Sequence, residues 1–222
     1  MPDVASAEEL ATEMVLLGEG AGRRTVALVT AMDNPLGRTV GNALEVQEAL
    51  DALAGKGDEE LVQVALVVAR EMCWLAEVEA DPGDALRSGS GRNKFLQMLI
   101  AQGGKIEMGL PRAPVQIEVP SLGDGHVQSI DALEVGLAGL ELGVGRRKKE
   151  DLVDPAAGIV IEAQVGARVQ VGQPLAAVHA RSEELARSVI TRLQNAWKLS
   201  ANEVKRPPHV LARVDKDGVT RA

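Results

Sequence analysis

The chain has almost no aromatic residues and a single cysteine. Its aromatic side chains, histidine apart, are Trp74, Phe95 and Trp197, and tyrosine is absent. Proteins that bind single-stranded nucleic acid stack the bases on aromatic side chains, so this composition argues against such a platform. The lone Cys73 excludes an intramolecular disulfide and is typical of a reducing compartment, so we expect a cytoplasmic location.

The chain also lacks a basic surplus and a long apolar run. It has 24 Lys and Arg against 32 Asp and Glu, a formal net charge of -8 over 222 residues. Nucleic-acid-binding domains usually carry a basic patch, which this balance does not favour. No apolar run approaches the roughly 18 residues that a membrane-spanning helix needs, and the first residues have no signal-peptide pattern. We therefore expect neither a nucleic-acid partner nor a membrane partner.

What is present suits a globular protein of one or two domains. With 45% hydrophobic and 25% charged residues, the chain can build a core. Three residues that break regular structure, Gly109, Pro111 and Pro114, follow a helical stretch and have no periodic pattern around them. We predict a linker at 105–114 between an N-terminal domain at 1–104 and a C-terminal domain at 115–222.

The N-terminal domain is predicted to contain one strand and several helices. Residues 25–30 form a run of β-branched and apolar residues, typical of a strand buried on both faces. Helical spacing predicts helices over 7–17, 39–53 and 58–79, and a further helix around Phe95. Asp58 is the expected N-cap of the long one, since two glutamates follow it.

The C-terminal domain is predicted to be rich in short strands. Alternating apolar and polar residues predict strands at 115–120 and 126–131, and three more lie between 159 and 178. Helices are expected at 133–142 and after Ser182, a good N-cap. Late strands are expected at 196–203 and 210–214, with frayed residues at the end.

The most informative stretch is the loop at 31–37, between the predicted strand and the helix after it. In open α/β sheets, ligands bind outside the carboxyl ends of the strands, and a helix N-terminus there favours an anion. The physical pattern alone predicts no more than a possible binding site.

The residues of this stretch resemble the thymidine and pyrimidine-nucleoside phosphorylase family. The resemblance is carried by TAMDNPLGRTVGNALEV at 30–46, QGG at 102–104, GVGRRKKED at 143–151 and DPAAGI at 154–159. It covers nearly the whole chain. It implies a pentosyltransferase that reversibly splits a pyrimidine nucleoside with phosphate, giving free base and a pentose 1-phosphate.

The chain departs from the family in one respect. Family members are about twice as long, and their phosphate-cradling Lys-His-Ser-Thr-Gly-Gly stretch and base-gripping residues precede the segment that corresponds to 23–53. This chain has no Lys-His pair, and its one Gly-Gly is Gly103-Gly104. The resemblance thus implies the C-terminal half of such an enzyme, with no catalytic or substrate-binding residue of its own, inactive when alone.

The resemblance also implies a fold and a cation site. The fold is a partial α/β domain, one strand plus helices, followed by a small β-rich, barrel-like domain of the α/β hammerhead type. The family binds a monovalent cation, K⁺ or Na⁺, and by the motif its ligands here are the main-chain oxygens of Leu36 and Thr39 and the Glu48 carboxylate. Other ligands of that site come from the absent phosphate loop, and three oxygens are few for a hard cation.

Other candidate sites are weaker. The strand pattern at 154–180 also resembles biotinyl and lipoyl carriers, but residues 152–197 contain no lysine to carry the cofactor. His126, His179 and His209 are isolated, and with Cys73 they have no zinc-binding spacing. The basic run at 146–149 is more typical of a solvated loop than of a phosphate site.

Two functions of different class therefore stay open. In the first, the chain is part of a nucleoside phosphorylase, either as a piece of a longer enzyme or as a half that assembles with a separate N-terminal half. In the second, it is a non-catalytic remnant with a structural or protein-binding role. A half-sheet without partner strands is expected to expose an edge and an apolar patch, which favours self-association.

Overall fold

The structure, a computed structural model, describes residues 1, 3–105 and 109–221. It mixes helices with three open sheets, which confirms the predicted α+β class, and no sheet closes into a barrel among the described residues. The helices are α1 (Val4–Gly20), α2 (Asn42–Leu53), α3 (Glu59–Leu75), α4 (Pro82–Arg87), α5 (Ser90–Ala101), α6 (Ala132–Leu142), α7 (Glu183–Ser188) and α8 (Ile190–Ala196). The strands are β1 (Ala27–Thr30), β2 (Thr39–Val40), β3 (Val115–Pro120), β4 (Gly125–Ile130), β5 (Gly158–Ile161), β6 (Arg168–Val169), β7 (Pro174–Ala180), β8 (Trp197–Ser200), β9 (Val210–Asp215) and β10 (Gly218–Arg221).

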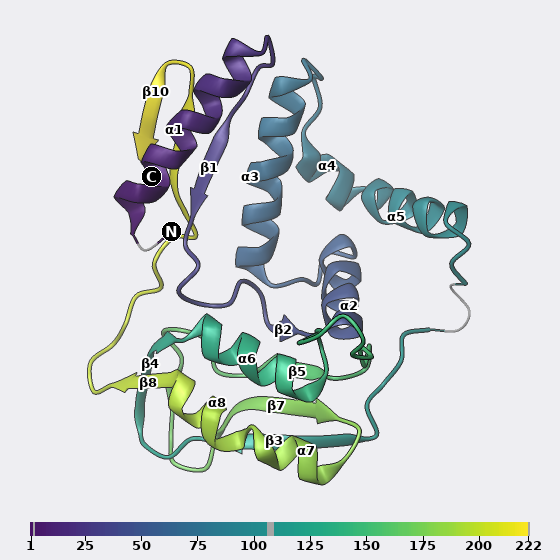
Figure 1. Ribbon diagram of the computed structural model, residues 1–222, viewed down its shortest axis with the longest axis vertical. Helices are drawn as coiled ribbons and strands as arrows, with labels where there is room; N and C mark the ends of the chain where they lie inside the picture. The colour runs from purple at the N-terminus through teal and green to yellow at the C-terminus, as the bar shows by residue number, and fades with distance from the viewer. Residues whose placement is uncertain (2, 106–108, 222) are drawn as a thin grey trace.

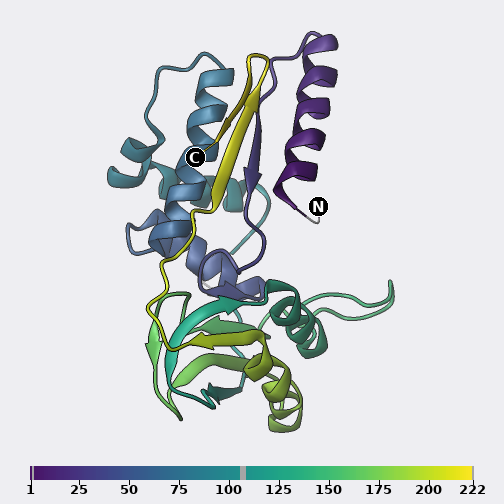
Figure 2. The same ribbon diagram turned by 90° about the vertical axis from the view of Figure 1, so that its left-hand side faces the viewer.

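The two ends of the chain meet in one small sheet of order β1-β9-β10, in which both pairings are antiparallel. Helix α1 packs on one face of this sheet, and α3 lies on the other side (Figures 1 and 2). The core between α1 and the sheet is small, and consists of Ala11, Val15, Val29, Ala212 and Val214. Because this sheet uses the last described residues, the prediction that the end of the chain is frayed was wrong.

The prediction that residues 25–30 form a strand buried on both faces was also wrong. In β1 only Val29 is buried, and Thr30 is exposed. The strand pairs with β9 alone, so its second edge has no partner strand among the described residues. A continuous apolar run is typical of a central strand, but here the strand lies at an edge.

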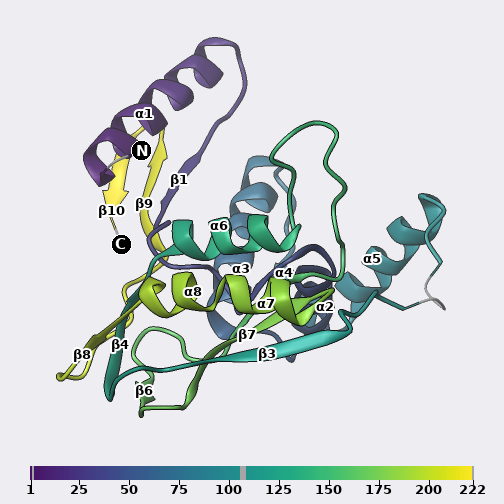
Figure 3. The ribbon, with the colours of Figure 1, turned by 60° about the horizontal axis from the view of Figure 1, so that its bottom comes forward.

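Most of the buried hydrophobic residues lie in the second half of the chain, and we call this cluster the second core. Sheet β2-β5-β7-β3 and sheet β6-β4-β8 pack with α6, α7 and α8, which lie on one side of the strands (Figures 1 and 3). Leu142, Ile161 and Leu193 are almost completely buried there. Trp197 closes the core from the start of β8, and its indole N–H donates to the Ala163 carbonyl at 2.8 Å.

Strand β2 joins the first half of the chain to this core. Thr39 and Val40 pair with Val160 and Ile159 of β5, so the helix predicted from residue 39 begins only at Asn42. The helical spacing of Val40 misled the prediction, because Val40 packs against the second core from a strand. A two-residue strand is short, yet it fixes where the loop at 31–38 lies.

Helices α2 to α5 have little core of their own. Ala43 is the one buried residue of α2, Gly83 that of α4, and α3 and α5 have none. Met72 and Trp74 of α3 are 64% and 49% exposed, and Ile100 of α5 is 60% exposed. Helices with an apolar face normally bury it against another element. These helices therefore leave apolar side chains exposed on their surface.

The predicted division of the chain into domains stays a prediction. The predicted linker at 105–114 includes residues 106–108, which lie outside the described residues. Strands β9 and β10 come from the predicted C-terminal domain, but they lie with β1 and α1 of the first. None of the described helices is long and apolar enough to cross a bilayer.

Candidate functional site

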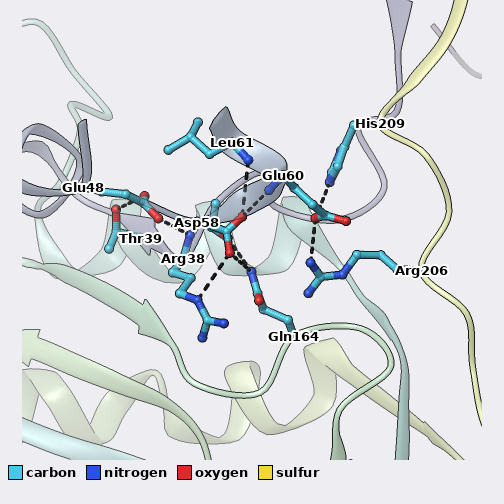
Figure 4. Close-up of polar contacts among 10 residues, drawn as sticks. Arg38, Thr39, Glu48, Asp58, Glu60, Leu61, Gln164, Arg206 and His209 are labelled. Carbon is cyan, nitrogen blue, oxygen red and sulfur yellow. Dashed lines mark hydrogen bonds and ion pairs between the residues drawn. The ribbon is translucent and has the colours of Figure 1, made fainter. Parts of the chain in front are cut away.

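The loop between β1 and β2 is held closed by the Glu48 carboxylate of α2. One carboxylate oxygen accepts from the Arg38 main-chain N–H at 2.6 Å, and the other accepts from the Thr39 hydroxyl, also at 2.6 Å (Figure 4). Gly37, with φ of 76°, passes so close to Glu48 that a Cβ there would lie 2.9 Å from a carboxylate oxygen. The positive φ favours glycine at this turn, and a side chain there would also displace the Glu48 carboxylate.

Beside this loop, Asp58 caps the N-terminus of α3 and also binds two residues from elsewhere. Its side chain accepts from the N–H groups of Glu60 and Leu61 at 3.1 and 3.3 Å. The amide of Gln164, from the turn after β5, donates to the other carboxylate oxygen at 3.0 Å. The guanidinium of Arg38 lies 3.4 Å from the same oxygen (Figure 4). Asp58 therefore links the loop, α3 and the second core.

Several groups act on the pKa of Asp58. Its side chain is only 5% exposed, and burial by itself would raise the pKa. The hydrogen bonds from Gln164 and from the α3 N-terminus, with the charge of Arg38, outweigh burial and lower the pKa below its ordinary value of 3.8. Asp58 is thus a structural carboxylate that stays ionised, and not a proton donor at neutral pH.

A second carboxylate of α3 binds the segment that leads to β9. Glu60 pairs with Arg206 at 2.9 Å and with the His209 Nε2 at 3.0 Å, and both partners come from the stretch between β8 and β9 (Figure 4). The His209 side chain is only 10% exposed. These contacts fix the path of the chain from the second core back to β1.

A small cavity lies between these two groups. Its volume is about 20 Å³, and it is lined by the loop (Ala31, Asn34, Pro35, Gly37), by Gln164 and Val165, and by Glu60, Arg206 and His209, among others. This is enough for a single water molecule and too small for a nucleoside. The nearby arginines are not free, since Arg38 is paired with Asp58 and Arg206 with Glu60. This pairing opposes the binding of a phosphate dianion.

Of the three predicted cation ligands, the structure brings two together. The Thr39 hydroxyl bonds to Glu48, as described. Directly before β2, the Arg38 carbonyl accepts from the Ile161 N–H at 2.7 Å, so by alternation the Thr39 carbonyl points away from β5. It is therefore not used by the sheet and fits the role of a main-chain ligand. Leu36 lies in the same loop and is 38% exposed, but none of the contacts described above joins it to Glu48.

The remaining candidates lie apart from one another. His126 is within 3.4 Å of the Gly166 carbonyl, and His179 lies on β7, where burial lowers its pKa although the charge of Glu162 opposes this. Cys73 lies in α3 and is free. No group of three or more potential metal-ligating side chains gathers within the described part of the chain.

The basic run at 146–149 is exposed, and Asp151 accepts from the main-chain N–H groups of Arg147 and Lys148.

Sequence patterns did not predict the contacts of Glu60 with Arg206 and His209. His209 appeared isolated, because its partner lies 149 residues away along the chain. Glu60 was expected only to favour the start of α3. The Pro207-Pro208 pair was the one local feature near this contact, and it signals a chain without regular structure and nothing about a partner.

The lowered pKa of Asp58 leads to a prediction about stability. A carboxyl group whose pKa is lower in the folded protein stabilises the fold at pH values above its unfolded pKa. That contribution is lost as the pH falls through the folded value. We expect Asp58→Asn to be less stable than the parent at pH 7. The difference in free energy of unfolding, measured with urea, should shrink as the pH is lowered from about 5 to below 3.8.

Asp217→Asn is the matched control, because Asp217 is exposed in the turn between β9 and β10. Its free energy of unfolding is expected to stay within about 0.5 kcal/mol of the parent. An Asp58→Asn variant whose deficit is the same at pH 7 and pH 3.5 would contradict the stated role of the charge.

The chain is similar in sequence to a family model and to curated proteins over part of their length. Residues 126–200 match a family model described as the pyrimidine nucleoside phosphorylase C-terminal domain. The chain is 38% identical over 213 residues to the pyrimidine-nucleoside phosphorylase of Bacillus subtilis, covering 90% of this chain and 49% of that protein. It is 38% identical over 215 residues to the thymidine phosphorylase of Mycobacterium tuberculosis, covering 96% of this chain and 50% of the other. The chain thus spans about half the length of the curated relatives it matches.

Proposed function

Because this chain is homologous along most of its length to the C-terminal half of the thymidine and pyrimidine-nucleoside phosphorylase family, we propose that it supplies the C-terminal part of an enzyme that splits pyrimidine nucleosides with phosphate. The resemblance inferred from the sequence is confirmed by the family model and these relatives. The products would be a free pyrimidine base and a pentose 1-phosphate. The proposal also implies that the chain has no phosphorolytic activity when it is alone.

One observation carries the proposal of inactivity. The match covers about half of each relative, and the sequence contains no Lys-His pair, so it contains no Lys-His-Ser-Thr-Gly-Gly stretch. Phosphorolysis needs a phosphate anion held in position and positive charge near the bond that breaks. The described residues around the loop at 31–38 offer no such positive charge, because Arg38 and Arg206 are already paired with Asp58 and Glu60.

The experiment that tests the proposal is the phosphate-dependent release of thymine from thymidine. The purified chain is assayed alone and after mixing with the N-terminal half of the Bacillus subtilis relative, which is also assayed by itself. We expect release only in the mixture, and only when phosphate is present. Release by the chain alone would overturn the proposed inactivity, and no release from any mixture would favour the non-catalytic remnant.

We further propose that a monovalent cation, K⁺ or Na⁺, binds at Leu36, Thr39 and Glu48. The Glu48 carboxylate and the Thr39 carbonyl fit the role, since hard cations prefer oxygen ligands. The cation would add positive charge beside α2 and hold the loop at 31–38 in place. The expected result is a higher melting temperature in KCl than in tetramethylammonium chloride, with the difference lost in Glu48→Ala. An equal melting temperature in both salts would count against the site.

The proposed location is the cytoplasm, and the proposed small-molecule partners are a pyrimidine nucleoside and phosphate. The location is supported by the single cysteine, Cys73, and by bacterial relatives that are nucleoside phosphorylases. Cell fractionation with an antibody against the chain tests it, and recovery in the extracellular fraction would contradict it.

A further inference from the structure

The sheet β6-β4-β8, at the lower left of Figure 3, carries polar side chains on its outer face. In the pairing of β4 with β6, His126 lies opposite Arg168, and Gly125 lies opposite Val169. Val127 and Val169 belong to the second core, and successive side chains of a strand point to opposite faces. His126 and Arg168 are therefore neighbours on the face that points away from this core.

A hollow of about 280 Å³ lies at this place, and we call it the β4–β6 hollow. Its polar lining residues are Asp124, His126, Arg168 and Gln170, which come from the two strands and from the chain directly beside them. Of the described residues that line it, none also lines the small cavity beside the loop at 31–38. Sites for drug-sized ligands usually measure about 300–1,000 Å³, so this hollow suits a compact ligand.

Arg168 brings a positive charge that the folded chain leaves unpaired. Its side chain is exposed, and it takes part in none of the ion pairs formed among residues 1, 3–105 and 109–221. The guanidinium group of arginine is a rigid fork of N–H donors, which matches the two oxygens of a carboxylate. Arg168 is thus available to an anion that enters the hollow.

His126 is held beside Arg168 and can add a second donor. Its Nδ1 lies 3.4 Å from the carbonyl oxygen of Gly166, which precedes Arg168 by two residues. This contact keeps the ring on the β6 side of β4. When Nδ1 donates to that carbonyl, Nε2 is left for a ligand, as an acceptor in the neutral ring and as a donor in the protonated one.

Asp124 decides which kind of anion fits. Its carboxylate accepts from the Val171 N–H at 2.7 Å, which holds it against the turn after β6. The hollow therefore contains one negative charge beside the positive charge of Arg168. A carboxylate carries a single charge and matches Arg168 alone, whereas a phosphate group carries nearly two and meets Asp124 as a like charge. This balance favours a carboxylate over a phosphate.

We propose that the β4–β6 hollow binds the carboxylate of a small organic acid or of a peptide C-terminus. The Arg168 guanidinium pairs with the carboxylate, and His126 donates to it from Nε2 when the ring is protonated. A ligand that contacts both side chains would also hold β6 more firmly, since β6 pairs with β4 at two positions. This inference does not depend on the proposed function, because no residue of the loop at 31–38 takes part in it.

The test is an NMR titration of the isotope-labelled chain with N-acetylglycine, which carries one carboxylate. The matched control ligand is N-acetylglycinamide, in which a neutral amide replaces the carboxylate. We expect the amide signals of Gly125, His126 and Arg168 to shift and saturate at millimolar concentrations of N-acetylglycine. The same signals should stay in place with N-acetylglycinamide.

Variants of the chain identify the groups that bind. Arg168→Gln is expected to weaken the binding of N-acetylglycine at least about tenfold, since hydrogen bonds between charged groups are the strong ones. His126→Ala is expected to weaken it less, by about twofold to fivefold. The matched control is Arg181→Gln, because Arg181 is exposed and follows the end of β7, whose start lies beside the turn after β6. It should change binding by less than about twofold, since salt screens distant charges.

The outcomes that would overturn the inference are distinct from those that identify the ligand. Equal shifts with N-acetylglycine and N-acetylglycinamide, or unchanged binding in a folded Arg168→Gln variant, would overturn it. Inorganic phosphate that binds the hollow more tightly than N-acetylglycine would also overturn it. Propionate that binds at least as tightly as N-acetylglycine would support a free organic acid as the ligand, and tighter binding of N-acetylglycine would support a peptide C-terminus.

Discussion

Replacing Gly41 with alanine is expected to lower the free energy of unfolding by about 3 kcal/mol or more. Gly41 has φ of 149° and ψ of 143°, a conformation that residues with a Cβ rarely adopt, and such strain costs about 1–3 kcal/mol. The added Cβ would also lie 2.5 Å from the Ala157 carbonyl oxygen and 2.9 Å from the Gly158 Cα. Both are main-chain atoms, which cannot rotate away as a side chain can, so overpacking adds about 1–3 kcal/mol.

The reason for this close approach is the short pairing of β2 with β5. Gly158 lies on the β5 side of this pairing, and a Cβ there would lie 2.4 Å from the Val40 carbonyl oxygen of β2. We therefore expect Gly158→Ala to have a similar effect. Either change should free the loop at 31–38 from the second core, which hydrogen exchange of Val40 and Ile159 would detect.

Gly20→Ala is the matched control, because no atom lies within 4 Å of a Cβ at that position and it ends the helical residues of α1. Its stability in urea is expected to equal or slightly exceed that of the parent. A Gly41→Ala variant with the urea midpoint of the parent would show that the two chain segments are not in contact at Gly41 and Gly158.

Leu193→Ala is expected to lower the free energy of unfolding by about 2–5 kcal/mol, the range measured for fully buried leucines. Leu193 has no exposed surface and lies in α8, at the centre of the core formed by α6, α8 and the strands beneath them. The loss combines transfer of the side chain to water with the cavity left behind. The neighbours of Leu193 come from regular strands and helices, which limits how far they can move to fill that cavity.

The control is the same substitution at Leu152, which is 92% exposed in the loop before β5. Leu152→Ala is expected to change stability by less than about 0.5 kcal/mol. Urea unfolding followed by the fluorescence of Trp197 measures both variants, since this indole lies in the same core. Equal losses in the two variants would contradict the position of the core.

Local sequence patterns predicted the second half of the chain well. The alternation at 115–120 predicted β3 with its bounds, and Ser182 was predicted to cap the helix that follows it, which is confirmed for α7. These signals depend on neighbours along the chain. By contrast, the exposure of β1 and the existence of β10 depend on β9, which contacts β1 from almost the other end of the chain. No pattern within 25–30 encodes that partner.

The candidate site was predicted in part for the same reason. Asp58 was expected to be an N-cap from the residues beside it, and this is confirmed by its bonds to Glu60 and Leu61. Its contacts with Arg38 and Gln164, and the pairing of Glu60 with His209, require the folded chain. Leu36, Thr39 and Glu48 were named from the family resemblance, and their role as cation ligands stays a prediction.

The pairing of β1 with β9 also orders events during protein synthesis. Ala27 pairs with Val214, so 187 residues (214 minus 27) must be made before this sheet can close. At about 5–20 residues per second, β1 would wait roughly 10–40 s after it is made, with both of its edges open. The core of the second half can form earlier, since it needs no residue beyond β8 apart from Val204. A released chain that ends ten residues early would therefore keep every residue of that core, but it would lack β10 and half of β9, so the N-terminal helix and strand would lose their sheet.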